Sequence, residues 1–330
     1  MNPYQPYRST LLTAQEVKAL SHFRPARVVL DVALCWGIIF AAWVVAAQYS
    51  RWWVILLATL VIGTRYYALF IIGHDGMHRR LFRDSRLNDL VSDLFVFAPI
   101  GAIIRLNKKN HILHHQHLAS EADPDRHKHG CFNKSTRFEY LFFFSGLVNL
   151  WPAFCNVFLQ KRKNQTEETS SRPSDRSEGS YVIRDLVILV ACQFALISGL
   201  TWAFGWWGYI VLWLFPVYVF TYCADLIRSF LEHSHPESDE KADQHRLITF
   251  LSNRVERIFL SPMNMNYHAV HHLWTSIPYF NLPRADRLIR DKAEAQGLIW
   301  RGSYLAYALK YFLALPLPEC RKDNQNRVVY

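Results

Sequence analysis

WWVILLATLVIGTRYYALFII occupies residues 52–72, and GHDGMH follows it directly at 73–78. The first segment contains a single charge, Arg65, and it reaches the roughly 20 residues that a helix needs to span hydrocarbon. The second segment places His74 and His78 four positions apart, a spacing that puts both side chains on one face of a helix. A predicted membrane helix that leads into two candidate metal ligands is the feature around which the rest of the chain is organised.

Three other apolar segments have a similar length, at 28–47, 181–204 and 206–227. The first of them is interrupted by one charge, Asp31. The links within each pair are very short, at 48–51 and at Gly205. Helices joined by so few residues are antiparallel neighbours. The sequence therefore predicts an all-α integral membrane protein with four transmembrane helices in two hairpins.

Basic residues give the expected orientation of these hairpins. The link at 48–51 carries Arg51 alone and the link at Gly205 carries none, whereas residues 79–137 and 161–163 are rich in Arg and Lys. The positive-inside rule places these longer segments, and both termini, in the cytoplasm. The net charge of +10 then reflects topology, together with attraction to anionic lipid head groups or an acidic protein partner. A nucleic-acid partner is not expected, because the basic residues are dispersed and no binding motif accompanies them.

We expect residues 1–330 to form a single domain. Its predicted parts are an N-terminal lead-in (1–27), the first hairpin (28–72), a cytosolic and interfacial section (73–180), the second hairpin (181–227) and a cytosolic tail (228–330). The apolar segments 90–104 and 138–159 are expected to be interfacial or re-entrant helices, because a single extra crossing would separate the histidines. Residues 161–180 are rich in Ser, Glu and basic side chains, which predicts a flexible loop.

Histidines outside the predicted spans form three segments with repeated spacing, which we call the first, second and third histidine boxes. They are HDGMH (74–78), HILHH (111–115) and HAVHH (268–272). The second and third boxes place His111, His114, His115, His268, His271 and His272 at i, i+3 and i+4, broadly on one helical face. His233 follows the fourth predicted span. In the predicted topology all of them lie on the cytoplasmic side.

A single histidine pair four residues apart often lies on a solvated helix with no ligand. Three spacings on one side of the membrane instead indicate a metal centre. Asp75 is expected to orient an imidazole by accepting its second N–H, and Asp123 and Asp125 are interpreted as structural or supporting residues. His117, His127, His129, His235 and His245 have no repeated spacing and are interpreted as solvated or supporting. A zinc-protease motif is excluded because Asp75 stands where that motif requires Glu.

The ligand type narrows the metal. Imidazole suits zinc, copper, iron and nickel, and eight or nine ligands exceed the four of one tetrahedral zinc ion. Two metal ions with open positions fit this count better. A redox-active pair at a membrane surface would suit oxygen chemistry on a lipid chain.

With these three boxes in order, the sequence resembles the integral-membrane fatty acid desaturase and hydroxylase superfamily. The phrases ASEADPD, RSFLEHSHP and NYHAVHHLWTSIPYFNLP strengthen the resemblance, which covers about residues 50–285. It implies a cytosolic helical cap that carries two Fe ions, held by the eight box histidines and by His233. It also implies that O₂ is a co-substrate and that Asn264 or Asn266 holds a metal-bound water. Asn110 and Val270 depart from commoner forms of the boxes without removing a ligand.

The resemblance further implies an external electron donor. No fused cytochrome b5 H-P-G-G segment is present, so a separate ferredoxin or cytochrome b5 is expected, and a basic cytoplasmic face would suit an acidic donor. The leading hypothesis is a desaturase of a lipid acyl chain. The alternatives are a lipid or carotenoid hydroxylase or ketolase, and a metal-binding membrane protein without catalysis. A transporter is less favoured because the predicted spans contain no histidine.

Overall fold

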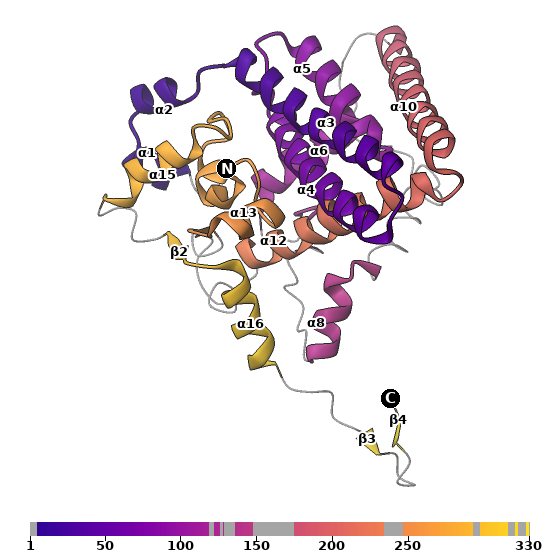
Figure 1. The fold of residues 1–330 in the computed structure, drawn as a ribbon. Coiled ribbons are helices and arrows are strands. Elements are labelled where there is room, and N and C mark those ends of the chain that lie inside the picture. The colour runs from indigo at the N-terminus through magenta and orange to yellow at the C-terminus, as the bar shows by residue number, and fades with distance from the viewer. Residues whose placement is uncertain are drawn as a thin grey trace.

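The computed structural model describes residues 5–118, 122–125, 128, 136–147, 175–233, 247–292, 298–315, 321–322 and 328–329. Helices dominate these residues, and the strands among them are two or three residues long (Figure 1). Four of the described helices are long and apolar enough to cross a membrane. The predicted all-α membrane class is therefore confirmed at this level.

The first two long helices are α3 (Pro25–Gln48) and α4 (Trp52–Met77), which pack against each other. Pro25 stands in the first turn of α3, where its missing N–H is not needed for a helical hydrogen bond. The apolar run predicted to end at residue 72 continues as helix to Met77. The last turn of α4 therefore carries His74 out of the apolar segment on a rigid backbone.

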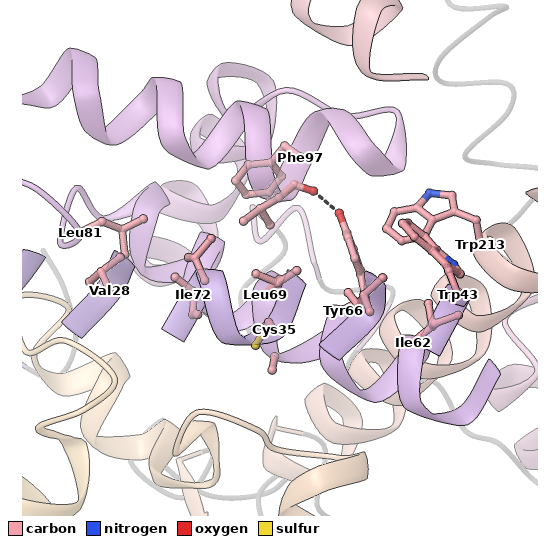
Figure 2. Packing of buried hydrophobic residues seen from close by; sticks show 14 of the residues in the cluster. Val28, Cys35, Trp43, Ile62, Tyr66, Leu69, Ile72, Leu81, Phe97 and Trp213 are labelled. Carbon is pink, nitrogen blue, oxygen red and sulfur yellow. Dashed lines mark hydrogen bonds between the residues drawn. The ribbon is translucent and has the colours of Figure 1, made fainter. Parts of the chain in front are cut away.

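Aromatic side chains pack α3 and α4 against the fourth long helix, Ile210–His233 (Figure 2). The Trp213 ring meets Tyr66 edge-on, with ring centroids 4.9 Å apart, and stacks on Trp36 at 5.7 Å. The Tyr66 hydroxyl donates a hydrogen bond to the Val96 carbonyl, as Figure 2 shows. Edge-on and stacked ring pairs have preferred geometries in addition to burying large apolar surfaces. This packing therefore fixes the relative positions of the helices that carry the histidines.

The second long pair differs from the prediction at its ends. The helix α10 (Asp175–Phe204) starts before the predicted span, so residues 175–180, predicted as loop, are helical. The fourth span runs continuously from Ile210 to His233. Its successive parts are η4 (Ile210–Leu214), α11 (Phe215–Val217), η5 (Tyr218–Cys223) and α12 (Ala224–His233), and η4 and η5 are π-helical. The prediction that this span begins at 206 and ends at 227 was wrong, and His233 lies in its last turn.

A sharp bend interrupts the segment between the first and second histidine boxes. The helical run α5 (Ser85–Ser92), η1 (Asp93–Phe97) and η2 (Ala98–Ile100) meets α6 (Ile104–His117) at 94°. Gly101 adopts a left-handed φ of 75° at the corner, which glycine tolerates without steric cost. The Asp93 carboxylate accepts a hydrogen bond of 2.7 Å from the Ile104 N–H at the start of α6. The bend aims α6, with the second box, back toward the end of α4.

Short helices and strands make up the remaining described elements. They are α1 (Gln5–Leu11), α2 (Ala14–Leu20), α8 (Arg137–Phe144), β1 (Ile248–Phe250), α13 (Arg254–Phe259), η7 (Met265–Tyr267), α14 (His268–Leu273), α15 (Leu282–Arg290), β2 (Ile299–Arg301), α16 (Tyr304–Ala314), β3 (Arg321–Lys322) and β4 (Val328–Val329). Strand β1 pairs with β2 in parallel, and β3 pairs with β4 antiparallel. Residues 148–159 of the second predicted interfacial segment, and 161–174 of the predicted loop, lie outside the described residues.

Candidate metal centre

Three helices deliver the histidine boxes to one place. The first box ends α4, the second lies on α6, and the third makes up most of the short helix α14. Gly73 lets η1 approach closely, because a Cβ at this position would lie 2.6 Å from the Val96 Cγ1 atom. His233 reaches the same place from the end of α12.

The nine histidines separate into two groups. In the first histidine group the ligand atoms all lie within 4.8 Å of one another, and its members are His74, His78, His111, His115 and His271. A second set with the same property contains His114, His233 and His272. His268 adjoins this second set, because its Nε2 lies 3.0 Å from that of His233 and 2.9 Å from that of His272. We call these four residues the second histidine group.

Helix geometry explains why each of the last two boxes serves both groups. Successive residues of a helix point about 100° apart, whereas residues at i and i+4 nearly coincide. In the second box His111 and His115 therefore join the first group, while His114 joins the second. In the third box the residues at i and i+4, His268 and His272, belong to the second group, whereas His271 belongs to the first. The two groups are in contact, since the His115 and His272 ring centroids are 4.1 Å apart.

Nitrogen–nitrogen distances show whether these imidazoles fit a shared cation. The Nε2 atom of His111 lies 2.8 Å from Nε2 of His78 and 3.1 Å from Nε2 of His115. Nε2 of His115 lies 3.3 Å from Nε2 of His271. A neutral imidazole has one N–H and can satisfy one such neighbour. Nitrogens that share a metal at about 2.0–2.1 Å lie about 2.8–3.0 Å apart in octahedral geometry and about 3.3–3.4 Å apart in tetrahedral geometry. The convergence therefore fits a metal ion.

The first histidine group also contains buried polar atoms without partners. The Nδ1 atoms of His74, His115 and His271 are buried and have no hydrogen-bond partner among the described residues. Buried polar groups without partners are costly. In His115 and His271 the converging atom is Nε2, so a cation there would occupy Nε2 and leave Nδ1 as it is.

The protonation state of the histidines suits metal binding. Burial, followed by the charges of neighbouring groups, lowers the pKa of His111, His115, His268, His271 and His272 well below the usual 6.5. Burial and the nearby Lys108 lower the pKa of His78 to about 3. A low pKa keeps imidazole neutral, which is the form that binds metals.

Asp123 and Asp75 were both predicted to support the site, but within the described part of the chain only Asp123 hydrogen-bonds to a histidine. The Asp123 carboxylate is fully buried, and its oxygens lie 3.0 and 3.1 Å from the Nδ1 atom of His114. This contact leaves Nε2 of His114 for a metal. Asp75, which was expected to orient an imidazole, instead accepts a 2.6 Å hydrogen bond from the Tyr279 backbone N–H. Its other oxygen has no partner among the described residues, so that expectation was wrong.

The remaining predicted supporting residues hold loops near the site. The Asp125 N–H donates to Asp123 at 2.9 Å. The Asn266 amide donates to the Phe250 carbonyl at 2.8 Å, and its buried oxygen has no partner among the described residues. Asn264 donates to the Tyr279 carbonyl at 3.2 Å.

The sequence analysis missed a buried charge network beside the second histidine group. Arg228 donates to Glu232 at 2.5 Å and to Asp225 at 2.7 Å, and Glu232 accepts from the Tyr304 hydroxyl at 2.5 Å. The Glu232 carboxylate lies 3.8 Å from Nε2 of His268. The sequence does carry a signal for this network. Arg228 and Glu232 are opposite charges four positions apart, directly before His233, and charged residues rarely enter a membrane span without a role.

Two cavities reach the histidines from different faces of α6. The chamber, of about 270 Å³, is lined by His74 and His111 of the first group and by His114 and His268 of the second. The cationic pocket, of about 370 Å³, is lined by His78, His115 and His272. It also contains Arg8, Arg79 and Lys108, and its described lining includes no carboxylate. Both histidine groups are therefore reachable from two separate directions.

Helices that can span a membrane, together with two adjacent groups of converging imidazoles that could hold metal ions, are typical of membrane proteins that bind metals through histidine. The family model described as fatty acid desaturase matches residues 50–304, and the chain belongs to this family. It is therefore an oxidoreductase of lipid metabolism, as the resemblance of the boxes predicted.

Known relatives are distant in sequence but cover most of the chain. An sn-1 acyl-lipid omega-3 desaturase (ferredoxin) from Nostoc sp. (strain 36) is 26% identical over 77% of this chain and 71% of its own length. A protein of the same description from Synechocystis sp. (strain ATCC 27184 / PCC 6803 / Kazusa) is 23% identical over 90% and 83%. The dihydrorhizobitoxine desaturase of Bradyrhizobium elkanii is 26% identical over 91% and 86%.

Proposed function

We propose that this protein is a membrane-bound desaturase that inserts a double bond into the acyl chain of a lipid. The observation that carries the proposal is the convergence of nine imidazoles from α4, α6, α12 and α14 into two adjacent groups. Two iron ions held there would supply O₂ activation. The balanced reaction removes two hydrogens from adjacent carbons, and O₂ with two electrons and two protons leaves as two water molecules.

The protein's own contribution is to hold neutral ligands in fixed positions. Burial keeps the His111 imidazole unprotonated, and Asp123 fixes the ring of His114. The chamber brings a substrate to the edges of both groups, and Phe70 and Phe97 give it an apolar wall. A rigid approach of this kind converts substrate binding into orientation of the reacting carbons.

We place the electron donor at the cationic pocket. Arg8, Arg79 and Lys108 surround the edges of His78, His115 and His272 there. Positive charge around the point of electron entry would attract an acidic carrier. Two of the relatives are named as ferredoxin desaturases, which supports a separate ferredoxin; a cytochrome b5 type donor has the same charge requirement.

The proposed orientation places both termini and the histidine boxes in the cytoplasm. The long connecting segments hold most of the Lys and Arg, whereas the links after Gln48 and Phe204 hold almost none. Cysteine labelling of single-cysteine variants in sealed cells tests this orientation. Labelling from outside at a position in α2 would overturn it.

One experiment tests the proposed reaction. The full chain and a His271→Ala variant are expressed in a host that has a ferredoxin and its reductase, and the lipids are compared by mass spectrometry. A loss of two mass units that requires His271 supports desaturation. A gain of one oxygen atom would assign the chain to the hydroxylase or ketolase alternative. Purified protein that contains no iron would refute the proposed metal centre.

A further inference from the structure

The chamber beside the histidines holds the substrate during the proposed reaction, so its lining bears on what that substrate is. Its walls come from α4, η1, α6, α12, α14 and the segment that follows the second box. The lining includes histidines of both groups, so any molecule in the chamber faces both. This makes the chamber, and not the apolar surface of the spans, the place where the substrate's reacting part lies.

The chamber is unexpectedly polar for a site that would accept hydrocarbon alone. Apart from the histidines, its apolar lining consists of Phe70, Met77 and Phe97. Its polar and charged lining consists of Asn107, Asn110, Asp125, Lys128, Asp225, Arg228 and Ser229. An apolar patch and a charged patch therefore share one small space.

Lys128 is the more exposed of the two cations in the described lining, with 29% of its side chain exposed against 4% for Arg228. Its Nζ lies 3.0 Å from an oxygen of Asp125, which uses one of its three N–H donors. Burial alone would lower the pKa of Lys128, but Asp125 and Asp225 outweigh it and raise the pKa, so the ammonium stays charged. Arg228 is almost fully buried, and three of its five N–H groups donate to Tyr67, Asp225 and Glu232.

A methylene chain that filled this chamber would strip water from these groups and offer no hydrogen bond in return. Such unpaired polar groups are penalised. A substrate end that carries a carbonyl or carboxylate oxygen would instead accept from Lys128. The chamber, at about 270 Å³, is smaller than pockets of about 300–1,000 Å³ that enclose whole ligands. It suits a polar end with a few adjoining carbons.

We infer that the substrate enters the chamber with its polar end, bound by Lys128, while its first carbons lie against Phe70 and Phe97. The substrate class is an amphiphile with a carbonyl or carboxylate acceptor at one end. The hydrogens removed are on carbons close to that end and far from the methyl end of a long chain. This inference rests on the proposed function, since it assigns the substrate's orientation in the same site.

A binding experiment tests the inference without turnover. Purified full-length protein in detergent is titrated with decanoate, and with decane as the apolar probe, by following the thermal unfolding midpoint. The wild-type chain should bind decanoate, and Lys128→Gln should weaken this binding roughly 10- to 100-fold, the loss of one charge-assisted hydrogen bond. Lys128→Arg should restore it. Lys108→Gln, the same change in the cationic pocket, should leave decanoate affinity unchanged.

Product analysis supplies the second arm. In the expression host, the new double bond should lie nearer the carbonyl end than the methyl end, and Lys128→Gln should lower its yield at any donor level. Lys108→Gln should lower the yield in a way that overproduction of the donor reverses. Decanoate binding that ignores Lys128, or a double bond placed near the methyl end, overturns the inference and leaves the desaturase standing. Lys128-dependent binding without any desaturated product overturns the proposed function instead.

Discussion

Replacing Asp123 with asparagine tests the proposal that an ordered second histidine group is needed for metal binding. The Asp123 side chain is completely buried, and both its oxygens approach Nδ1 of His114. One of these oxygens also accepts the Asp125 N–H at 2.9 Å. Asparagine keeps the size of the side chain but removes its charge and offers one acceptor oxygen in place of two.

The expected loss follows from the role of such supporting carboxylates. Replacing the group that orients a metal-binding histidine typically costs 10- to 100-fold in metal affinity or activity, or about 1.4–2.8 kcal/mol. The loss should fall on the second histidine group, because Asp123 holds His114, which is a member of that group. The variant should therefore lose one of two iron ions before the other.

The measurement is an iron titration of purified full-length protein, followed by elemental analysis after dialysis against a weak chelator. Asp291→Asn, which changes an exposed carboxylate after α15, is the matched control and should retain both ions. The unfolding midpoint of each apoprotein shows whether the fold survives. If Asp123→Asn binds two ions as tightly as the wild type, the assignment of His114 to a metal through Nε2 is refuted.

Three further outcomes are expected. Gly63→Ala should destabilise the protein by about 1–3 kcal/mol, because the new Cβ would overlap the Phe220 ring; Gly37→Ala, whose Cβ meets nothing within 4 Å, should not lower the thermal midpoint in detergent. The metal-free protein should lose stability as pH falls below about 6.5. The reason is that His78 has a pKa of about 3 in the folded chain, so in this pH range the unfolded chain binds a proton there and the folded chain does not. A thermal unfolding midpoint that is independent of pH between 5 and 8 would contradict this. Arg8→Gln should raise the donor concentration needed for half-maximal turnover at low salt and have less effect at high salt, with equal effects at both salts arguing against charge-guided docking.

Local patterns carried the prediction of the spans and of the histidine boxes. Long apolar runs and the spacing of His111, His114 and His115 depend on neighbouring residues alone, so both can be read without knowing the fold. The ends of the spans were less predictable. His74 and His233 fall within helices that continue past the apolar runs, because helical hydrogen bonding does not stop where hydropathy does.

Partners that lie far apart in sequence were beyond the reach of such patterns. Asp75 stands beside His74 in the chain, yet its hydrogen bond goes to Tyr279, 204 positions away. Likewise, the sequence shows Arg228 and Glu232 as a local pair, but only the structure shows that Glu232 also contacts Tyr304 and His268. Adjacency in sequence was therefore a poor guide to which acid supports which imidazole.

The sequence by itself determined that this protein is helical, suited to a membrane, and equipped with histidines at metal-binding spacing, because these properties arise from hydropathy and from helical periodicity. The tertiary structure decided how the histidines divide. His114 and His115 are neighbours, yet they serve different groups, since each residue turns about 100° around the helix. The first group also draws histidines from α4, and the second draws one from α12. The same packing places Lys128 in the chamber and Lys108 in the cationic pocket, a distinction that no local pattern contains.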